Sequence, residues 1–267
     1  MFHSEPLDVL PLWAFVALTL ALVYGAVECG VRLGRYRRQV SEAEKEATIG
    51  PIVGATMGLL AFMLAFTFGL AASRFDARRK VLVDEANAVG TAYLRAGFLE
   101  AARRDEVRGL LRRYVDGRLT VLETGDVARL HDDSAEIHAG LWRQVEAAAA
   151  GDPRSVPIGL FTSAVNDVID IHSTRWLVAV QGRIPIVLWF TLYLAAGCSM
   201  FVLGYHVGLS NSRRSLSVAA LAVAFTSVLL LIADLDRPRE GVIQVNQQAF
   251  LDLRDAWAQD AATAASS

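Results

Sequence analysis

Two phenylalanines and the basic residues after them form the part of this sequence with the most specific chemical potential. Phe62 and Phe66 stand four residues apart in an apolar stretch, so both rings lie on one helix face. Such rings from symmetric subunits would form a dry constriction that gates by dewetting, and their positive edges would weakly favour anions. Core packing or lipid contact is the other interpretation, and periodicity alone favours it. Arg74, Arg78 and Arg79 follow the apolar stretch.

Three glycines precede the phenylalanines at the same spacing of four residues, at Gly50, Gly54 and Gly58. Small residues at this spacing let helix backbones approach closely, and we interpret Gly50 and Gly54 as helix-packing positions. A row of i, i+4 residues drifts by about 40° per step, which places Gly50 roughly 160° around the helix from Phe66. The glycines can therefore face a partner helix while the phenylalanines face a central axis.

Hydrolytic or redox chemistry is harder to build from this sequence. His131 and His138 share a helix face, but the Asp132-Asp133 pair between them reads as a solvated helix start. The phosphate-loop, serine-hydrolase and zinc-protease motifs are absent from the sequence. We therefore expect no catalytic residue, no metal site and no cofactor.

One weaker enzymatic interpretation remains. Asn166, Asp167, Asp170 and His172 fall on one predicted amphipathic helix and could surround a site in a membrane enzyme. We interpret them as polar contacts within a helical bundle.

The composition indicates membrane spans combined with a polar domain. Of the 267 residues, 54% are hydrophobic and 20% are charged, which is too apolar for an ordinary soluble domain and too charged for spans alone. The net charge of −2 supplies no basic field for nucleic acid. Four apolar runs are long enough to cross a bilayer: about Leu10 to Val31, Ile49 to Ala72, Ile184 to Val207 and Leu216 to Ala233.

The order of these runs predicts an all-α membrane protein with a helical polar insert. We expect a first span pair in residues 1–72, the insert in residues 73–183, a second span pair in residues 184–236 and a tail in residues 237–267. The insert is rich in helix formers and has apolar residues at helical spacing.

The linkers and breaks between the predicted helices can also be read from the sequence. A basic linker from Arg32 to Ala47 joins the first two spans, and Gly125 and Gly151-Asp152-Pro153 mark breaks within the insert. The helix from Phe66 to Leu94 is predicted to leave the membrane without interruption.

Charge does not decide which side of the membrane holds the insert. Eight Lys and Arg residues flank the spans on the insert side, and seven flank them on the other side. The positive-inside rule depends on a clear excess, so the topology stays open at this point.

Beyond these patterns, the segment FMLAFTFGLAASRFDARR resembles the pore helix of bestrophin channels and their bacterial relatives. In that family an F-x-x-x-F pair is followed eight residues later by Arg and an aromatic residue, which fall here on Arg74 and Phe75. The whole chain is similar to the bestrophin-like membrane family through AFTFGLAASRFDARR, VLVDEANAVGTAYLR, RIPIVLWF and DLDRPREG.

The resemblance implies a homopentamer in the bacterial inner membrane, with the second span lining an axial pore. It implies a constriction at Phe62 and Phe66, with a third neck position at Gly58, where the family usually has a branched aliphatic residue. The insert and both termini would be cytoplasmic, and the pore helix would end there at Ser73, Arg74, Phe75, Arg78 and Arg79. The basic group at Arg35–Arg38 would then lie outside, as an anion-attracting vestibule.

Two acidic features outside the pore helix have structural interpretations. Glu28 lies near the end of the first span and can pair with Arg32, one turn later. Asp234 and Asp236 close the fourth span beside Arg237, and we expect them to pair with arginines or with the insert. Ca²⁺ takes six to eight oxygen ligands, more than this segment offers.

We expect passive ion conduction, with anions preferred, by a homo-oligomer embedded in the lipid bilayer. The alternative is a non-conducting membrane scaffold or signalling protein whose helical insert binds a soluble partner.

Overall fold

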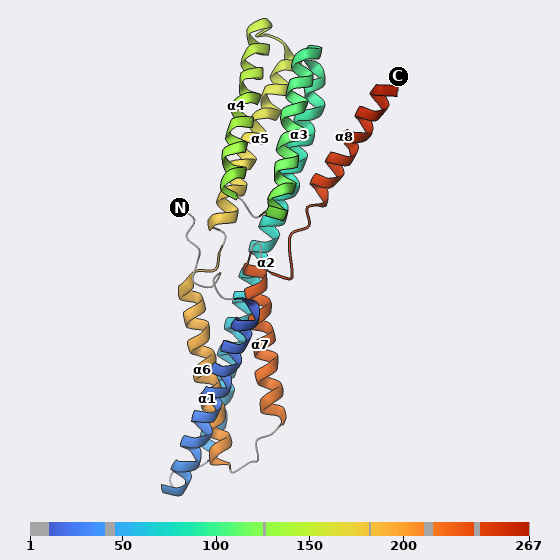
Figure 1. The fold of residues 1–267 in the computed structure, drawn as a ribbon. Coiled ribbons are helices and arrows are strands. Elements are labelled where there is room, and N and C mark those ends of the chain that lie inside the picture. The colour runs from blue at the N-terminus through green and yellow to red at the C-terminus, as the bar shows by residue number, and fades with distance from the viewer. Residues whose placement is uncertain are drawn as a thin grey trace. The chain divides into compact units, whose positions relative to one another are not determined.

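The computed structural model describes residues 11–40, 46–124, 127–181, 183–210, 216–237 and 241–266. Regular structure in these ranges is entirely helical. The elements are α1 (Leu12–Val40), α2 (Glu46–Arg95), the 3-10 helix η1 (Ala96–Phe98), α3 (Ala101–Thr124), α4 (Val127–Gly151), α5 (Val156–Gln181), α6 (Ile186–Leu209), α7 (Leu216–Asp236) and α8 (Gln248–Ser266) (Figure 1).

The chain divides into two compact units, and the division falls within α2. The first, here called the membrane unit, comprises residues Met1–Phe75 and Gly182–Gln244. The second, the helical unit, comprises Asp76–Gln181 and Val245–Ser267.

The membrane unit is built from α1, the first part of α2, α6 and α7. Four helices of the described residues, α1, α2, α6 and α7, are long and apolar enough to cross a bilayer. Their core contains Phe15 of α1, Leu60 of α2, Leu192 of α6 and Ile232 of α7. These helices lie where the sequence predicts spans, whereas their arrangement in a bilayer stays a prediction.

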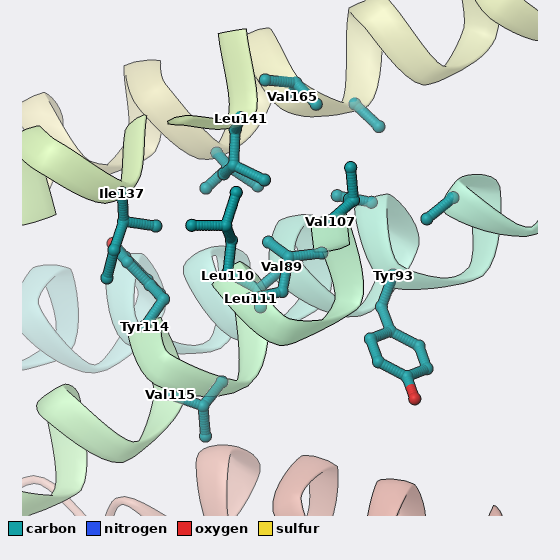
Figure 2. Packing of buried hydrophobic residues seen from close by; sticks show 14 of the residues in the cluster. Val89, Tyr93, Val107, Leu110, Leu111, Tyr114, Val115, Ile137, Leu141 and Val165 are labelled. Atoms are coloured by element: carbon teal, nitrogen blue, oxygen red, sulfur yellow. The ribbon is translucent and has the colours of Figure 1, made fainter. Parts of the chain in front are cut away.

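The helical unit packs the second part of α2 against α3, α4, α5 and α8. Its core is a continuous apolar cluster to which each of these helices contributes, through Val89, Leu111, Leu141, Val165 and Phe250. The labelled side chains in Figure 2 show how α2, α3, α4 and α5 meet. Apolar residues recur along these helices at helical spacing, so burial of one stripe per helix accounts for the bundle.

Several expected element boundaries are confirmed. Helix α2 runs without interruption from Glu46 to Arg95, as predicted for Phe66 to Leu94. The break at Gly151-Asp152-Pro153 separates α4 from α5. Gly125 lies outside the described residues.

The basic linker is shorter than expected, because α1 continues as helix to Val40. Its arginines fall in the last turns of α1, where cations interact favourably with the helix dipole.

Candidate functional site

The apolar part of α2 has a buried face and an exposed face. Leu60, Leu64 and Ala71 are buried in the core of the membrane unit. Phe62 and Phe66 are 68% and 57% exposed. At 100° per residue, Phe62 lies roughly 160° to 180° around the helix from the three buried residues. The two rings therefore point away from the chain's own core, toward lipid or another protein chain.

Gly50, Gly54 and Gly58 of α2 make no close contact with the described residues of this chain. A Cβ atom at Gly50, Gly54 or Gly58 would meet no atom within 4 Å outside the local helix. Gly58 lies about 40° around the helix from Phe62, on the phenylalanine side. The predicted packing of Gly50 and Gly54 against a neighbouring helix therefore has no partner among the described residues of one chain and stays a prediction.

The residues expected at the end of the pore helix differ in exposure. Ser73 and Arg79 are exposed, whereas Arg74, Phe75 and Arg78 are partly buried. Phe75 packs against the apolar core of the membrane unit. Nη1 of Arg74 is buried and has no hydrogen-bond partner among the described residues.

The close helix contact that the structure does contain is between α1 and α6. A Cβ at Gly30 would overlap the carbonyl oxygen of Phe201, and a Cβ at Gly204 would overlap that of Val27. Gly34 and Gly208 pack in the same way one turn further along. Sequence reasoning missed this contact, although both helices carry glycines four residues apart, which is the signal for close packing.

The acidic pair at the end of α7 accepts backbone hydrogen bonds. Asp234 accepts from the N–H groups of Val242 at 2.6 Å and Ile243 at 2.9 Å. Asp236 accepts from the N–H of Ile184 at 2.9 Å, just before α6. These carboxylates thus tie the chain segments on either side of the span pair. Their expected pairing with arginines stays a prediction.

The pair expected near the end of the first span is present. Nε of Arg32 donates to Oε1 of Glu28 at 3.0 Å, one turn apart on α1. The ionisable group in this span is therefore neutralised locally.

A buried charged cluster in the helical unit was not anticipated from the sequence. Glu85 of α2, beyond the apolar part of that helix, is 0% exposed. Its carboxylate pairs with Arg118 of α3 at 2.6 Å and with Arg175 of α5. The hydroxyl of Tyr114 donates to Oε1 of Glu85 at 2.5 Å. Burying a carboxylate without partners costs much free energy, and these contacts offset that cost for Glu85.

Two histidines complete this cluster, which we call the Glu85 cluster: Glu85, Tyr114, Arg118, His138, His172 and Arg175. Nη2 of Arg118 lies 2.6 Å from Nδ1 of the buried His172. The rings of His138 of α4 and His172 of α5 meet edge to face, with centroids 4.8 Å apart. The cluster therefore joins α2, α3 and α5 by polar contacts and α4 by ring contacts.

The electrostatics of the cluster separate its ionised members from its neutral ones. Burial alone would raise the pKa of Glu85, but the charges of Arg175 and Arg118 and the hydrogen bond from Tyr114 hold that pKa below its usual value. Burial and the neighbouring Glu85 raise the pKa of Tyr114. Burial, followed by the charge of Arg118, lowers the pKa of His138 to about 4. At neutral pH Glu85 is thus ionised, while Tyr114 and His138 are neutral.

The residues of the weaker enzymatic interpretation do not come together. His172 belongs to the Glu85 cluster, as expected of a polar core contact. Asn166 and Asp170 are exposed and hydrogen-bond each other along α5 at 2.8 Å, and Asp167 is exposed as well. The expectation of core contacts is therefore correct for His172 and wrong for the other three. His131 has no described side chain.

Comparison with family models identifies a Bestrophin-like domain over residues 15–250. The chain belongs to the Bestrophin-like family. Comparisons with curated proteins and with solved structures found no match. Together with the long apolar helices, family membership makes this a membrane protein of a family whose members are generally ion channels rather than enzymes.

Proposed function

We propose that the chain is one subunit of a homo-oligomeric channel, a pentamer, that conducts ions passively and prefers anions. In this proposal α2 lines the axis, Phe62 and Phe66 form its constriction, and Gly58 widens the neck on one side of them. The observation that carries it is the exposure of both rings on the α2 face opposite the core. In an isolated chain such an apolar face has lipid as its only neighbour, whereas in a ring of subunits it surrounds the axis.

The glycines of α2 support assembly through the same helix. Open backbone at Gly50 and Gly54 lets a neighbouring subunit approach closely on a face distinct from that of the phenylalanines. One helix per subunit encloses an axis only in a cyclic oligomer. Assembly is therefore a condition of conduction.

The basic end of the pore helix supports anion preference. Arg74, Arg78 and Arg79 lie about two to four turns after Phe66 and would concentrate anions below the constriction. In the proposed topology Ser73 to Arg79 and the helical unit lie in the cytoplasm of a bacterial cell, below the inner membrane. Single cysteines at Ala147 and Ser212, labelled by an impermeant reagent in intact cells, test this: Ser212 should react and Ala147 should not.

Flux through liposomes tests the constriction. We expect purified protein to pass chloride, and the double variant Phe62→Ala with Phe66→Ala to raise the flux or relax its selectivity, because the dry barrier is removed. Phe68→Ala is the matched control, since Phe68 is a partly exposed ring on the same helix, roughly 120° around the axis from Phe62. Absence of flux in every form would refute conduction.

The oligomeric state tests the assembly independently. Native mass measurement in detergent should show a cyclic oligomer, and Gly54→Leu should weaken it, whereas Gly25→Leu on α1, another glycine with open space, should not. A monomeric wild type would remove the axial pore.

An exposed apolar patch in the helical unit favours a second candidate, a scaffold or signalling role. Leu94, Phe98 and Leu160 are exposed, and Nη1 of Arg95 donates to the carbonyl of Leu160 at 2.8 Å, which places these segments together. A soluble partner that binds wild type but not the triple serine variant at these positions, in a protein that passes no ions, would support this role over conduction.

A further inference from the structure

A cavity of about 270 Å³ lies between α3 and α8, two helices of the helical unit. Both helices line it, through Arg112, Val115 and Asp116 of α3 and Arg254, Trp257 and Ala258 of α8. Its volume equals that of roughly nine water molecules in the liquid. The cavity therefore has room for a small organic ligand.

The apolar side of this cavity is fixed by the core of the helical unit. Val115 and Trp257 are both buried members of that core. The indole of Trp257 stacks on the ring of the buried Tyr93 of α2, with centroids 4.2 Å apart and planes at 12°. Packed side chains of this kind hold their positions, so a ligand meets a preformed apolar surface.

Two guanidinium groups from different helices line the polar side. Nη2 of Arg112 donates to the hydroxyl of Tyr93 at 2.7 Å, a neutral partner that holds the group in place. Nε of Arg254 lies 3.8 Å from Oδ1 of Asp255, which is longer than a hydrogen bond. A guanidinium group has five N–H donors. Both arginines therefore keep donors that no described residue uses.

The charges of the lining favour an anion. Two arginines against one aspartate, Asp116, give the lining a net charge of +1. A guanidinium fork matches the planar carboxylate group, with which it can form two parallel hydrogen bonds. A monoanion neutralises the lining, whereas a phosphate dianion would leave the complex with an excess negative charge. The lining thus fits a carboxylate with an apolar body.

We propose that this cavity binds a small organic carboxylate, whose anionic end pairs with Arg112 and Arg254. Its apolar end then lies against Trp257. Because the ligand contacts both α3 and α8, its binding stabilises the docked position of α8 on the helical unit. The site is independent of conduction, since every residue of its lining belongs to the helical unit.

Calorimetric titration of the full-length protein in detergent with isovalerate tests the site. We expect saturable binding, and Arg254→Gln should weaken it by about tenfold or more, because charge-assisted hydrogen bonds are lost. Arg113→Gln is the matched control, since Arg113 is an exposed arginine of α3 outside the lining. Isovaleramide, which has the same shape without the charge, should not bind. Absence of isovalerate binding, or equal affinity in wild type and Arg254→Gln, would overturn the proposal.

Two further variants separate binding in the cavity from attraction to a charged surface. Ala258→Phe fills the cavity and keeps every charge, so it should abolish binding. Asp116→Asn removes the negative charge of the lining and should tighten binding by up to about fivefold. In hydrogen exchange, isovalerate should raise the protection of α8 amides in wild type and not in Ala258→Phe. Unchanged binding in Ala258→Phe, or inorganic phosphate binding as tightly as isovalerate, would refute a carboxylate site.

Discussion

The two units of this protein differ in the side chains that make their tightest contacts. In the membrane unit, large apolar residues such as Trp13, Phe62 and Phe190 lie on the outside, and the closest internal contact is made by glycines. In the helical unit, Tyr93, Tyr114 and Phe161 are fully buried, and a carboxylate lies among them. Lipid removes the hydrophobic drive between helices, so close packing of small residues holds spans together, whereas water drives large side chains inward.

An exposed apolar side chain can therefore indicate either contact with lipid or a functional site, and the two cases have to be distinguished. Most outward apolar residues of the membrane unit need only lipid. Phe62 and Phe66 differ from these residues in two respects. They lie on one face of α2, and a basic helix end follows them. In the helical unit the informative residues are the buried charges, since a helical bundle has no need of them for packing.

The largest effect should come from removing the buried carboxylate. Glu85→Gln leaves Arg118 and Arg175 without their anion and should destabilise the protein by about 3–5 kcal/mol. Thermal unfolding in detergent measures this loss. Glu106→Gln, an exposed glutamate on α3, should have almost no effect, and equal stability of the two variants would contradict a structural role for the cluster.

A smaller loss is expected where the membrane unit packs its glycines. Gly204→Ala pushes a methyl group into the carbonyl of Val27 and should cost about 1–3 kcal/mol through separation of α1 and α6. Gly25→Ala, where a methyl group meets open space, serves as the control in the same unfolding assay. Equal melting of both variants would show that α1 and α6 are not packed this closely.

The pH dependence of stability should be moderate and specific to the helical unit. The pKa of His138 falls from 6.5 to about 4 on folding, so the unfolded chain binds a proton that the folded chain refuses. Stability is therefore full above pH 6.5 and falls as the pH drops toward 4, by about 1–2 kcal/mol after solvent screening of the partly exposed ring. Unfolding free energies of wild type and His138→Gln across this range should converge at low pH.

The smallest change in stability is expected at the proposed constriction. Phe62→Ala removes a side chain that is 68% exposed and should alter the unfolding free energy by less than about 0.5 kcal/mol. Leu64→Ala, on the buried face of the same helix, is the contrasting variant for this measurement. A large loss in Phe62→Ala would place this ring in a packed interface and weaken its role as a pore residue.

The prediction of the elements from sequence succeeded where the signal is local. The apolar runs, the uninterrupted α2 and the break at Gly151 each follow from hydropathy, helix propensity or a breaker within a few residues. The shortened linker is the exception, because basic residues after Val31 form good helix and no local breaker ends α1 there.

The site residues also divide into those with a local sequence signal and those without one. The pattern from Phe62 to Arg79 could be found in sequence because helix geometry relates its members directly. Glu85 could not be separated from the other glutamates of the chain, since its partners Tyr114 and Arg175 are 29 and 90 residues away.

The sequence by itself therefore determined the all-helical fold class, the long apolar helices and the family, since these depend on composition, periodicity and motifs along one helix at a time. Only the tertiary structure decided which glycines pack, which face of α2 is left open and which charges are buried. Those properties depend on how helices distant in sequence are paired and rotated about their axes. Because successive residues are 100° apart around a helix, a shift of one residue places a different side chain against the neighbouring helix.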